Sequence, residues 1–217
     1  APALTSLSRA PIPWTEEDLF QYLRTGYSSR HGAAAGPMAP VVEELAQLPE
    51  SDVRAIAHYV ASFNAPPPDA ATLDRQARVL EQRSATLART MTGPADRLYQ
   101  SACAVCHQSD QGVPMFGAKP SLALNTNLHG DKPDNVIQAV LKGIPAPSSN
   151  ALGDMPSFAD SFDDRQVAEL VHYLRARFAP DKPAWQGVDA AVARIRGSAS
   201  TGAKVVHGAN GANGAHH

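Results

Sequence analysis

The chain has 217 residues and a formal net charge of −2, with 19 Lys and Arg against 21 Asp and Glu. This balance excludes the strongly basic footprint of a nucleic-acid-binding domain. Only two cysteines are present, which excludes a disulfide framework. No stretch approaches the roughly 20 consecutive apolar residues that span a bilayer. The length is enough for roughly one and a half to two small domains. The 18 Pro and 15 Gly are typical of compact helices joined by long loops.

The first segment, residues 1–64, contains two predicted helices separated by a methionine loop. Residues 17–26 predict the first helix, and residues 57–60 belong to the second. Between them, Met38 lies in a loop that begins with Gly36 and Pro37. Gly and Pro favour a turn at this position.

Residues 65–93 are predicted to be a linker and a connecting helix. Consecutive prolines at 66–68 form a stiff spacer, and a helix is expected from about Ala71 to Met91. One side of this helix is apolar and another is basic, through Arg75, Arg78, Arg83 and Arg89. We favour a solvated face for these arginines. The alternative is a docking surface for an acidic partner or phospholipid.

The run Cys103-Ala104-Val105-Cys106-His107 is the most informative motif in the chain. Two thiols on one helical turn can each add to a vinyl group of one porphyrin, and the adjacent imidazole can then bind the iron. A structural zinc site would require a second ligand pair, and a thioredoxin-like dithiol should follow a strand. The sequence offers neither. A helix from about Ala95 would carry Tyr99 on the same face as Cys103 and His107.

Met155 is the predicted second axial ligand of the iron. It lies between Gly153 and Pro156, in a loop that could hold a thioether against the metal. His129 is the rival ligand, but its neighbours Gly130 and Asp131 indicate a solvated loop histidine.

The last predicted helix begins at Asp163-Asp164 and ends before Pro180. Val167, Leu170, Val171 and Leu174 form its apolar stripe, with Tyr173 beside it. Residues 181–217 lose this periodicity and become rich in Gly, Ala, Asn and Ser from Gly197, so they are expected to be extended or disordered.

The helix, methionine loop and final helix occur twice. Residues 17–26 align with residues 134–143 at an offset of 117, and Met38 falls on Met155 at the same offset. Residues 57–60 align with residues 171–174 at an offset of 114.

The attachment motif of the first repeat would fall before residue 1. We therefore expect residues 1–64 to be the C-terminal half of an earlier domain that lacks its own C-x-x-C-H. Met38 is a candidate ligand of a second haem, present only if the missing segment is supplied. The alternative is a decayed domain that never bound haem. Half a domain buries little surface, so these residues should be stabilised by packing against another polypeptide or against the second domain.

With these motifs, residues 94–180 resemble a complete class I cytochrome c domain. The resemblance implies an all-α fold in which the first and last helices pack through Ala95, Tyr99 and Tyr173. It also implies that the carbonyl of Pro120 accepts the Nδ1 proton of His107, and that Leu122 and Phe158 help to bury one covalent haem c.

Residues 9–180 further resemble cytochrome subunits, or cytochrome extensions, of periplasmic dehydrogenases that oxidise alcohols, aldehydes or N-heterocycles such as nicotinate. The resemblance implies a periplasmic electron carrier rather than an enzyme, which a partner could hold at the membrane face. Its partners would be a catalytic dehydrogenase subunit and an acceptor, namely quinone, another cytochrome or an oxidase. Two alternatives remain: an open-site haem enzyme or sensor, and a docking module in which haem only stabilises the fold.

Overall fold

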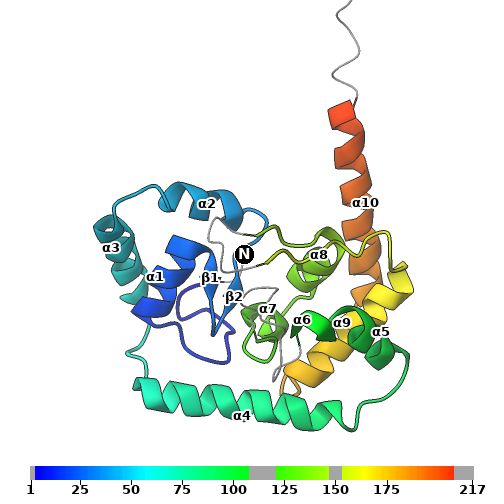
Figure 1. Cartoon of the computed structure of the whole chain (residues 1–217), viewed down its shortest axis with the longest axis horizontal. Coiled ribbons are helices and arrows are strands. Elements are labelled where there is room, and N and C mark those ends of the chain that lie inside the picture. Colours follow the sequence, from blue (N-terminus) through cyan, green and yellow to red (C-terminus); the bar gives the residue numbers. More distant parts are fainter. Residues whose placement is uncertain (1–2, 108–120, 147–152, 208–217) are drawn as a thin grey trace, which may run out of the picture.

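The computed structural model describes residues 3–107, 121–146 and 153–207, with side chains described as far as residue 198. The fold is all-α, as expected, apart from one small hairpin (Figure 1). The elements in chain order are α1 Glu16–Thr25, β1 Tyr27–Ser28, β2 Gly32–Ala33, α2 Met38–Leu45, α3 Glu50–Ala61, α4 Ala70–Ala88, α5 Pro94–Ala102, α6 Ala104–His107, α7 Thr126–His129, α8 Asp134–Lys142, α9 Asp164–Phe178 and α10 Val188–His207.

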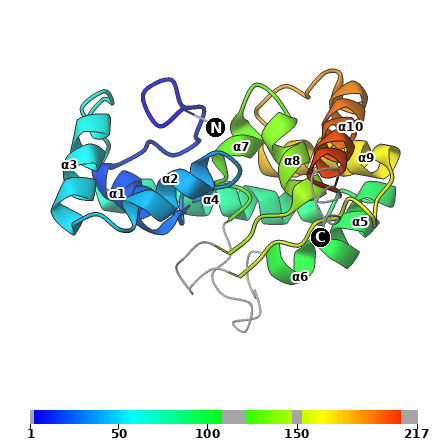
Figure 2. The same cartoon turned by 90° about the horizontal axis from the view of Figure 1, so that it is seen from above.

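These elements form two units bridged by one long helix. The N-terminal unit holds α1 to α3 and the hairpin, and the C-terminal unit holds α5 to α10. The views in Figures 1 and 2 both show α4 extending beneath the two units. α4 begins at the predicted place, where the Asp69 side chain accepts a hydrogen bond from the Thr72 amide. Its arginines are all exposed.

In the N-terminal unit, α1 packs against α3. α1 begins with a capping box, in which the Thr15 hydroxyl accepts a bond from the Asp18 amide and Asp18 accepts one from the Thr15 amide. It ends at Gly26, whose φ of 76° allows the chain to turn into the hairpin. The buried core of this unit consists of Trp14, Leu19, Phe20, Tyr22, Leu23, Ala34, Val42, Val53 and Ala57.

In the C-terminal unit, α5 packs against α9. Pro94 occupies the first turn of α5, and Asp163 caps α9 through a reciprocal pair with Gln166. The Tyr99 ring lies 5.5 Å from the ring of Tyr173 and 5.8 Å from the ring of Phe178. The predicted aromatic contact between the first and last helices of this domain is therefore confirmed.

The prediction for residues 181–217 was wrong over most of the segment, because residues 188–207 form α10. This helix packs on α8 and α9 (Figure 1). Val188, Val192 and Ile195 are at most 2% exposed within the main core. Their spacing of four and three residues gives one apolar face, which the surrounding Gly, Ala and Ser composition obscured. Residues 208–217 lie outside the described residues.

The two units share a small core of their own. Ile12 from the N-terminal unit is buried with Leu73 and Ala77 of α4 and with Leu124, which precedes α7. The Thr126 amide donates to the carbonyl of His31 at 3.2 Å. Gly32, at a φ of 110°, lies close to Asn125, the residue that caps α7, and an added Cβ would meet the side-chain amide nitrogen of Asn125 at 2.7 Å. The N-terminal unit therefore does pack against the rest of the chain.

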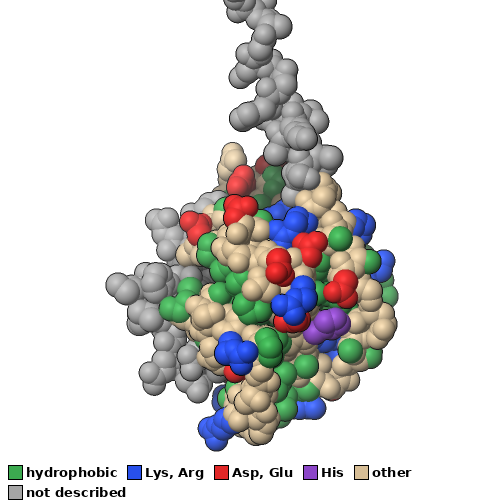
Figure 3. All heavy atoms as spheres, turned by 90° about the vertical axis from the view of Figure 1, so that its right-hand side faces the viewer, with side chains coloured by type: hydrophobic (Ala, Val, Ile, Leu, Met, Phe, Trp, Pro, Cys, Tyr) green, Lys and Arg blue, Asp and Glu red, His purple; other side chains and the backbone are tan. Residues whose placement is uncertain are grey.

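Charges of both signs are mixed on the face seen in Figure 3, where acidic, basic and apolar side chains alternate over the C-terminal unit. Within the described part of the chain, no helix combines the length and apolar character needed to cross a membrane.

Candidate haem site

The two thiols and the imidazole of the motif lie on one helical turn. Cys103 caps the end of α5, and α6 carries the chain through Cys106 to His107. The amides of Cys106 and His107 both donate to the Cys103 carbonyl, at 3.1 and 2.9 Å. Both cysteines are free thiols of intermediate exposure. This arrangement presents two thiols and an imidazole within one turn, which is the geometry that covalent capture of a porphyrin requires.

The Cys103 thiol is held in its protonated form. Burial, with a smaller contribution from the neighbouring Cys106, raises the pKa of Cys103 to about 11. A nucleophile or a partner in disulfide exchange must act as a thiolate, and this thiol is almost entirely protonated at neutral pH. The environment of Cys103 therefore favours the protonated thiol over the thiolate. Addition of S–H across a vinyl double bond uses this thiol form, whereas nucleophilic attack requires the thiolate.

Tyr99 fixes the end of the motif. Its hydroxyl donates a hydrogen bond to the His107 carbonyl at 3.1 Å, and its ring is fully buried between α5 and α9. Burial raises the pKa of Tyr99 well above its ordinary value, so the hydroxyl stays a donor at every physiological pH. The Tyr99 side chain thus takes part in the packing of α5 on α9 and also holds the backbone of His107 in place.

The backbone of Met155 is paired with that of Ile144. Its amide and carbonyl form two hydrogen bonds with Ile144, each 2.9 Å long. Gly143 makes this pairing possible, because it has a φ of 70° and an added Cβ would collide with the Met155 carbonyl and lie 2.8 Å from the Ser157 amide. Sequence reasoning singled out Met155 but missed Gly143, although the repeat aligns it with the helix-ending Gly26.

The structure brings several of the predicted site residues to the edge of one core. Cys103, Leu122, Met155 and Phe158 are all partly buried and pack against the main cluster of the C-terminal unit. Phe158 also stacks on Phe162, with ring centroids 5.3 Å apart. Pro120 lies outside the described residues. Cys103, Leu122, Met155 and Phe158 therefore each contact one common core.

His129 differs from its prediction. It is 1% exposed, and its Nε2 lies 2.9 Å from the Ala123 carbonyl. Burial lowers the pKa of His129, an effect that the bond to Ala123 opposes. The expectation of a solvated loop histidine was wrong, because His129 lies in α7 with its ring buried against the carbonyl of Ala123.

Met38 begins α2, where it is partly buried against the N-terminal core. Sequence reasoning missed a buried polar group elsewhere in the same unit. The buried His31 ring stacks on Trp14, with centroids 3.6 Å apart, and its Nε2 lies 3.8 Å from Asp18. Burial alone would raise the pKa of Asp18, but interactions with His31, Thr15 and Arg30 lower it to about 2. This group ties the hairpin to α1.

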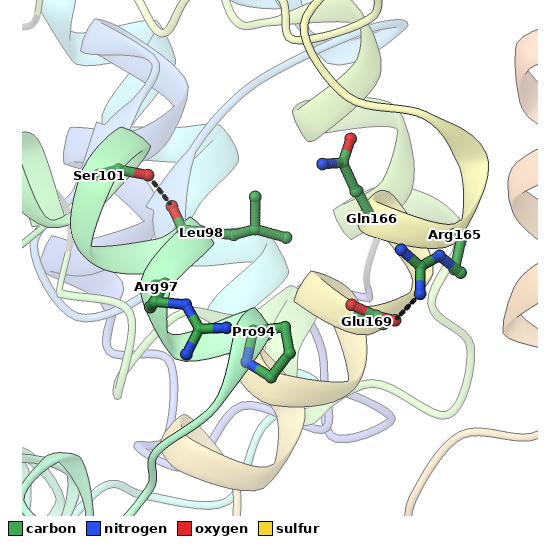
Figure 4. Close-up of a pocket in the computed structure, with 7 residues that line it drawn as sticks. All are labelled: Pro94, Arg97, Leu98, Ser101, Arg165, Gln166 and Glu169. Atoms are coloured by element: carbon green, nitrogen blue, oxygen red, sulfur yellow. Dashed lines mark hydrogen bonds and ion pairs between the residues drawn. The ribbon is translucent and has the colours of Figure 1, made fainter.

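A shallow hollow also lies between α5 and α9 (Figure 4). Leu98 and Gln166 face it from opposite helices, while Arg165 pairs with Glu169 at 3.4 Å on one side. Its lining is Pro94, Arg97, Leu98, Ser101, Arg165, Gln166 and Glu169. None of these residues belongs to the thiol–imidazole motif, so this hollow marks a helix contact and not the candidate haem site.

Residues 92–174 match the family model described as cytochrome c oxidase, cbb3-type, subunit III. The matched span contains the whole thiol–imidazole motif and Met155. The chain contains a cytochrome c domain. This domain coincides with α5 to α9, the elements that position the motif and the methionine loop.

Known proteins similar to this cytochrome chain include named dehydrogenase components. It is 48% identical over 196 residues to a nicotinate dehydrogenase subunit from Pseudomonas putida, covering 90% of this chain and 16% of that protein. It is 35% identical over 197 residues to the fructose dehydrogenase cytochrome subunit of Gluconobacter japonicus, covering 82% of this chain and 40% of that protein. It is 32% identical over 170 residues to the gluconate 2-dehydrogenase cytochrome c subunit of Pantoea cypripedii, covering 75% of this chain and 37% of that protein. The chain thus spans well under two thirds of each of these relatives.

Proposed function

We propose that this chain is an electron-transfer module, in which Cys103 and Cys106 would hold one haem c and His107 and Met155 would bind its iron. The observation that carries the proposal is the placement of Cys103, Cys106 and His107 on one helical turn. Met155 supports it, because it packs against the same core as Cys103. An imidazole and a thioether are the axial pair of small electron-carrying cytochromes. A haem held by these residues would supply a one-electron couple.

The residues present fit this group. Cys103 and Cys106 are free and lie one helical turn apart, and the backbone of Met155 is held by two hydrogen bonds with Ile144. Tyr99 anchors the carbonyl of His107, and Leu122 and Phe158 add apolar surface. The contribution of the protein is to orient the two ligands, exclude water and set the potential through burial and ligand identity. We also propose that the Pro120 carbonyl accepts the Nδ1 proton of His107.

The proposed electron donor is a catalytic dehydrogenase subunit, and the proposed acceptor is quinone, another cytochrome or an oxidase. The names of the similar proteins support a dehydrogenase partner. Covalent haem attachment takes place outside the cytoplasm, so we propose a periplasmic location, with membrane association through a partner. In the N-terminal unit, we propose Met38 as the ligand of a second haem when an attachment motif is supplied from outside residues 1–64.

Ligand access to the iron tests the proposal against an open-site haem enzyme or sensor. The purified chain, matured with haem, is reduced and exposed to carbon monoxide, and the oxidised form is exposed to cyanide. A site closed by Met155 should show no rapid spectral change with either probe, together with reversible one-electron redox behaviour. Rapid binding of both ligands by the unmodified chain would contradict electron transfer through a closed site.

A further inference from the structure

α3 carries an exposed apolar stripe at the edge of the N-terminal unit. Ile56 is 37% exposed, Tyr59 is 65% exposed and Phe63, just beyond the helix end, is 52% exposed. Their spacing of three and four residues places them on one side of the helix. The Tyr59 and Phe63 rings meet edge to face, with centroids 5.1 Å apart. We call Ile56, Tyr59 and Phe63 the α3 stripe.

The internal repeat shows that this exposure is specific to one side of α3. Val53 and Ala57 align with Val167 and Val171 of α9, and all four are fully buried. The α3 stripe aligns with Leu170, Tyr173 and Arg177 of α9, which are only 0%, 6% and 5% exposed. The inner sides of the two helices are therefore equivalent, but the outer side of α9 is covered whereas that of α3 is open.

In the C-terminal unit, α5 covers Tyr173 and Arg177. The Tyr173 hydroxyl donates to Asp96 at 2.8 Å, and the Arg177 guanidinium lies 4.5 Å from the centroid of the Tyr99 ring. Figure 4 shows α5 and α9 facing one another along this contact. By contrast, Figures 1 and 2 both show α3 at the outer end of the N-terminal unit, with its inner side on α1.

We propose that the α3 stripe is the docking surface for an amphipathic helix of the α5 type, carried by the attachment half of another cytochrome c repeat. Contiguous exposed apolar surface of this kind marks an interaction site. The stripe offers Tyr59 where α9 has Tyr173, so the incoming helix would present an aromatic residue, as α5 presents Tyr99. Because Phe63 replaces the cationic Arg177, the contact with that aromatic is more apolar than in the C-terminal unit.

The docking surface follows from the repeat and from the exposed fractions of the aligned residues, and it does not depend on the electron-transfer proposal. The repeat also specifies the occupant by helix type and register, which distinguishes this surface from one with a general affinity for proteins. At the 117-residue offset, a copy of residues 92–117 placed directly before Ala1 reproduces the spacing of the second repeat. Such a fusion brings an α5-type helix to the α3 stripe without altering the existing chain.

The experiment compares hydrogen exchange at the α3 amides in the full chain and in this fusion. Docking should slow exchange by about tenfold or more, since a covered helix opens less readily than an exposed one. Replacing both exposed aromatics, Tyr59→Ser with Phe63→Ser, should abolish the slowing. The control is His58→Ser, because His58 aligns with His172, which stays exposed on the complete domain; this fusion should keep the slowing.

Two results would overturn the inference. One is exchange at α3 that is equal in the fusion and the parent chain, or slowing that survives the double substitution. The other is self-association of the parent chain in sedimentation, lost on the double substitution, which would make a second copy the occupant. Retained protection in α1, which packs against α3, verifies that the N-terminal unit of each variant is folded, and unchanged exchange in α5 and α9 verifies the C-terminal unit. A chain found to lack electron-transfer activity would leave this readout intact.

Discussion

Met155 owes its position to Gly143 and Ile144, two residues that sequence reasoning did not identify. The repeat and the Gly/Pro-bounded loop indicated which methionine to choose. They could not indicate that its backbone pairs with Ile144 or that Gly143 must lack a side chain for the loop to approach. These facts depend on contacts between segments about a dozen residues apart in sequence, which local patterns do not encode.

The substitution Met155→Ala should lower the midpoint potential of the haem, because a thioether stabilises ferrous iron relative to water or an empty position. It should also remove the ferric methionine-ligand absorption band and allow rapid carbon monoxide binding. Spectroelectrochemical titration measures all but the last of these effects. Met91→Ala is the matched control, since Met91 is also partly buried against the main core. An unchanged potential and band in Met155→Ala would disprove the ligand assignment.

His129 should make the stability of the protein dependent on pH. Burial lowers its folded-state pKa below 6.5, and Lys182 and Arg175 act in the same direction, although the Ala123 carbonyl and Asp181 oppose them. Below pH 6.5 the unfolded chain therefore binds a proton that the folded chain resists. The free energy of unfolding should fall as the pH decreases from about 7.5 to about 5.5.

Denaturant unfolding at the two pH values measures this effect. The substitution His129→Gln should flatten the pH dependence, whereas His172→Gln, on the exposed side of α9, should preserve it. The role assigned to His129 fails if the slope with pH is the same in His129→Gln as in the parent chain. Since His31 is also buried with a lowered pKa, some dependence should persist in the variant.

At the scale of the helices, the sequence was most informative where apolar spacing and capping residues agree. α5 and α9 begin where Pro94 and Asp163 indicated, and both have the predicted buried face. The hairpin β1–β2 was not predicted, because two-residue strands carry no alternation of apolar and polar residues. α10 was not predicted, because only three large apolar residues mark its buried face within a segment whose composition suggests disorder.

α10 should contribute substantially to the stability of the C-terminal unit. Ile195 is 2% exposed, and Ile195→Ala should reduce the free energy of unfolding by about 2–5 kcal/mol through lost burial and a residual cavity. The exposed neighbouring position gives the control, and Ala193→Ser should change it by less than about 0.5 kcal/mol. Equal effects of the two substitutions, measured by denaturant unfolding, would show that α10 does not pack as described.

At the scale of the whole molecule, the two units are joined by α4 and by the small core around Ile12. The sequence predicted that residues 1–64 pack against another polypeptide or the second domain, since half a domain cannot bury enough surface. It could not predict that Leu124 and the backbone of Thr126 would receive them, because this contact joins segments far apart in the sequence. The buried stack of His31 on Trp14 escaped prediction for a related reason: a stack depends on ring orientation.

The coupling of the two units can be measured with a double-mutant cycle. Ile12→Ala and Leu124→Ala should each destabilise the protein by about 2–5 kcal/mol, and the two effects should depart from additivity by about 0.5–3 kcal/mol because both residues share one core. A cycle between Ile12 and Ile195, which belong to separate cores, serves as the control and should be additive. Additivity in both cycles would mean that Ile12 and Leu124 are not energetically coupled, which would contradict the shared core.

The most direct test of the central claim is the haem content of the purified chain, taken from its intact mass and pyridine haemochrome spectrum with a reduced-minus-oxidised spectrum. We predict one covalent haem per chain, a ferric methionine-ligand band, and complete loss of covalent haem in the variant Cys103→Ala/Cys106→Ala. A folded chain that carries no covalent haem after expression with the haem-attachment machinery would contradict electron transfer by this chain altogether.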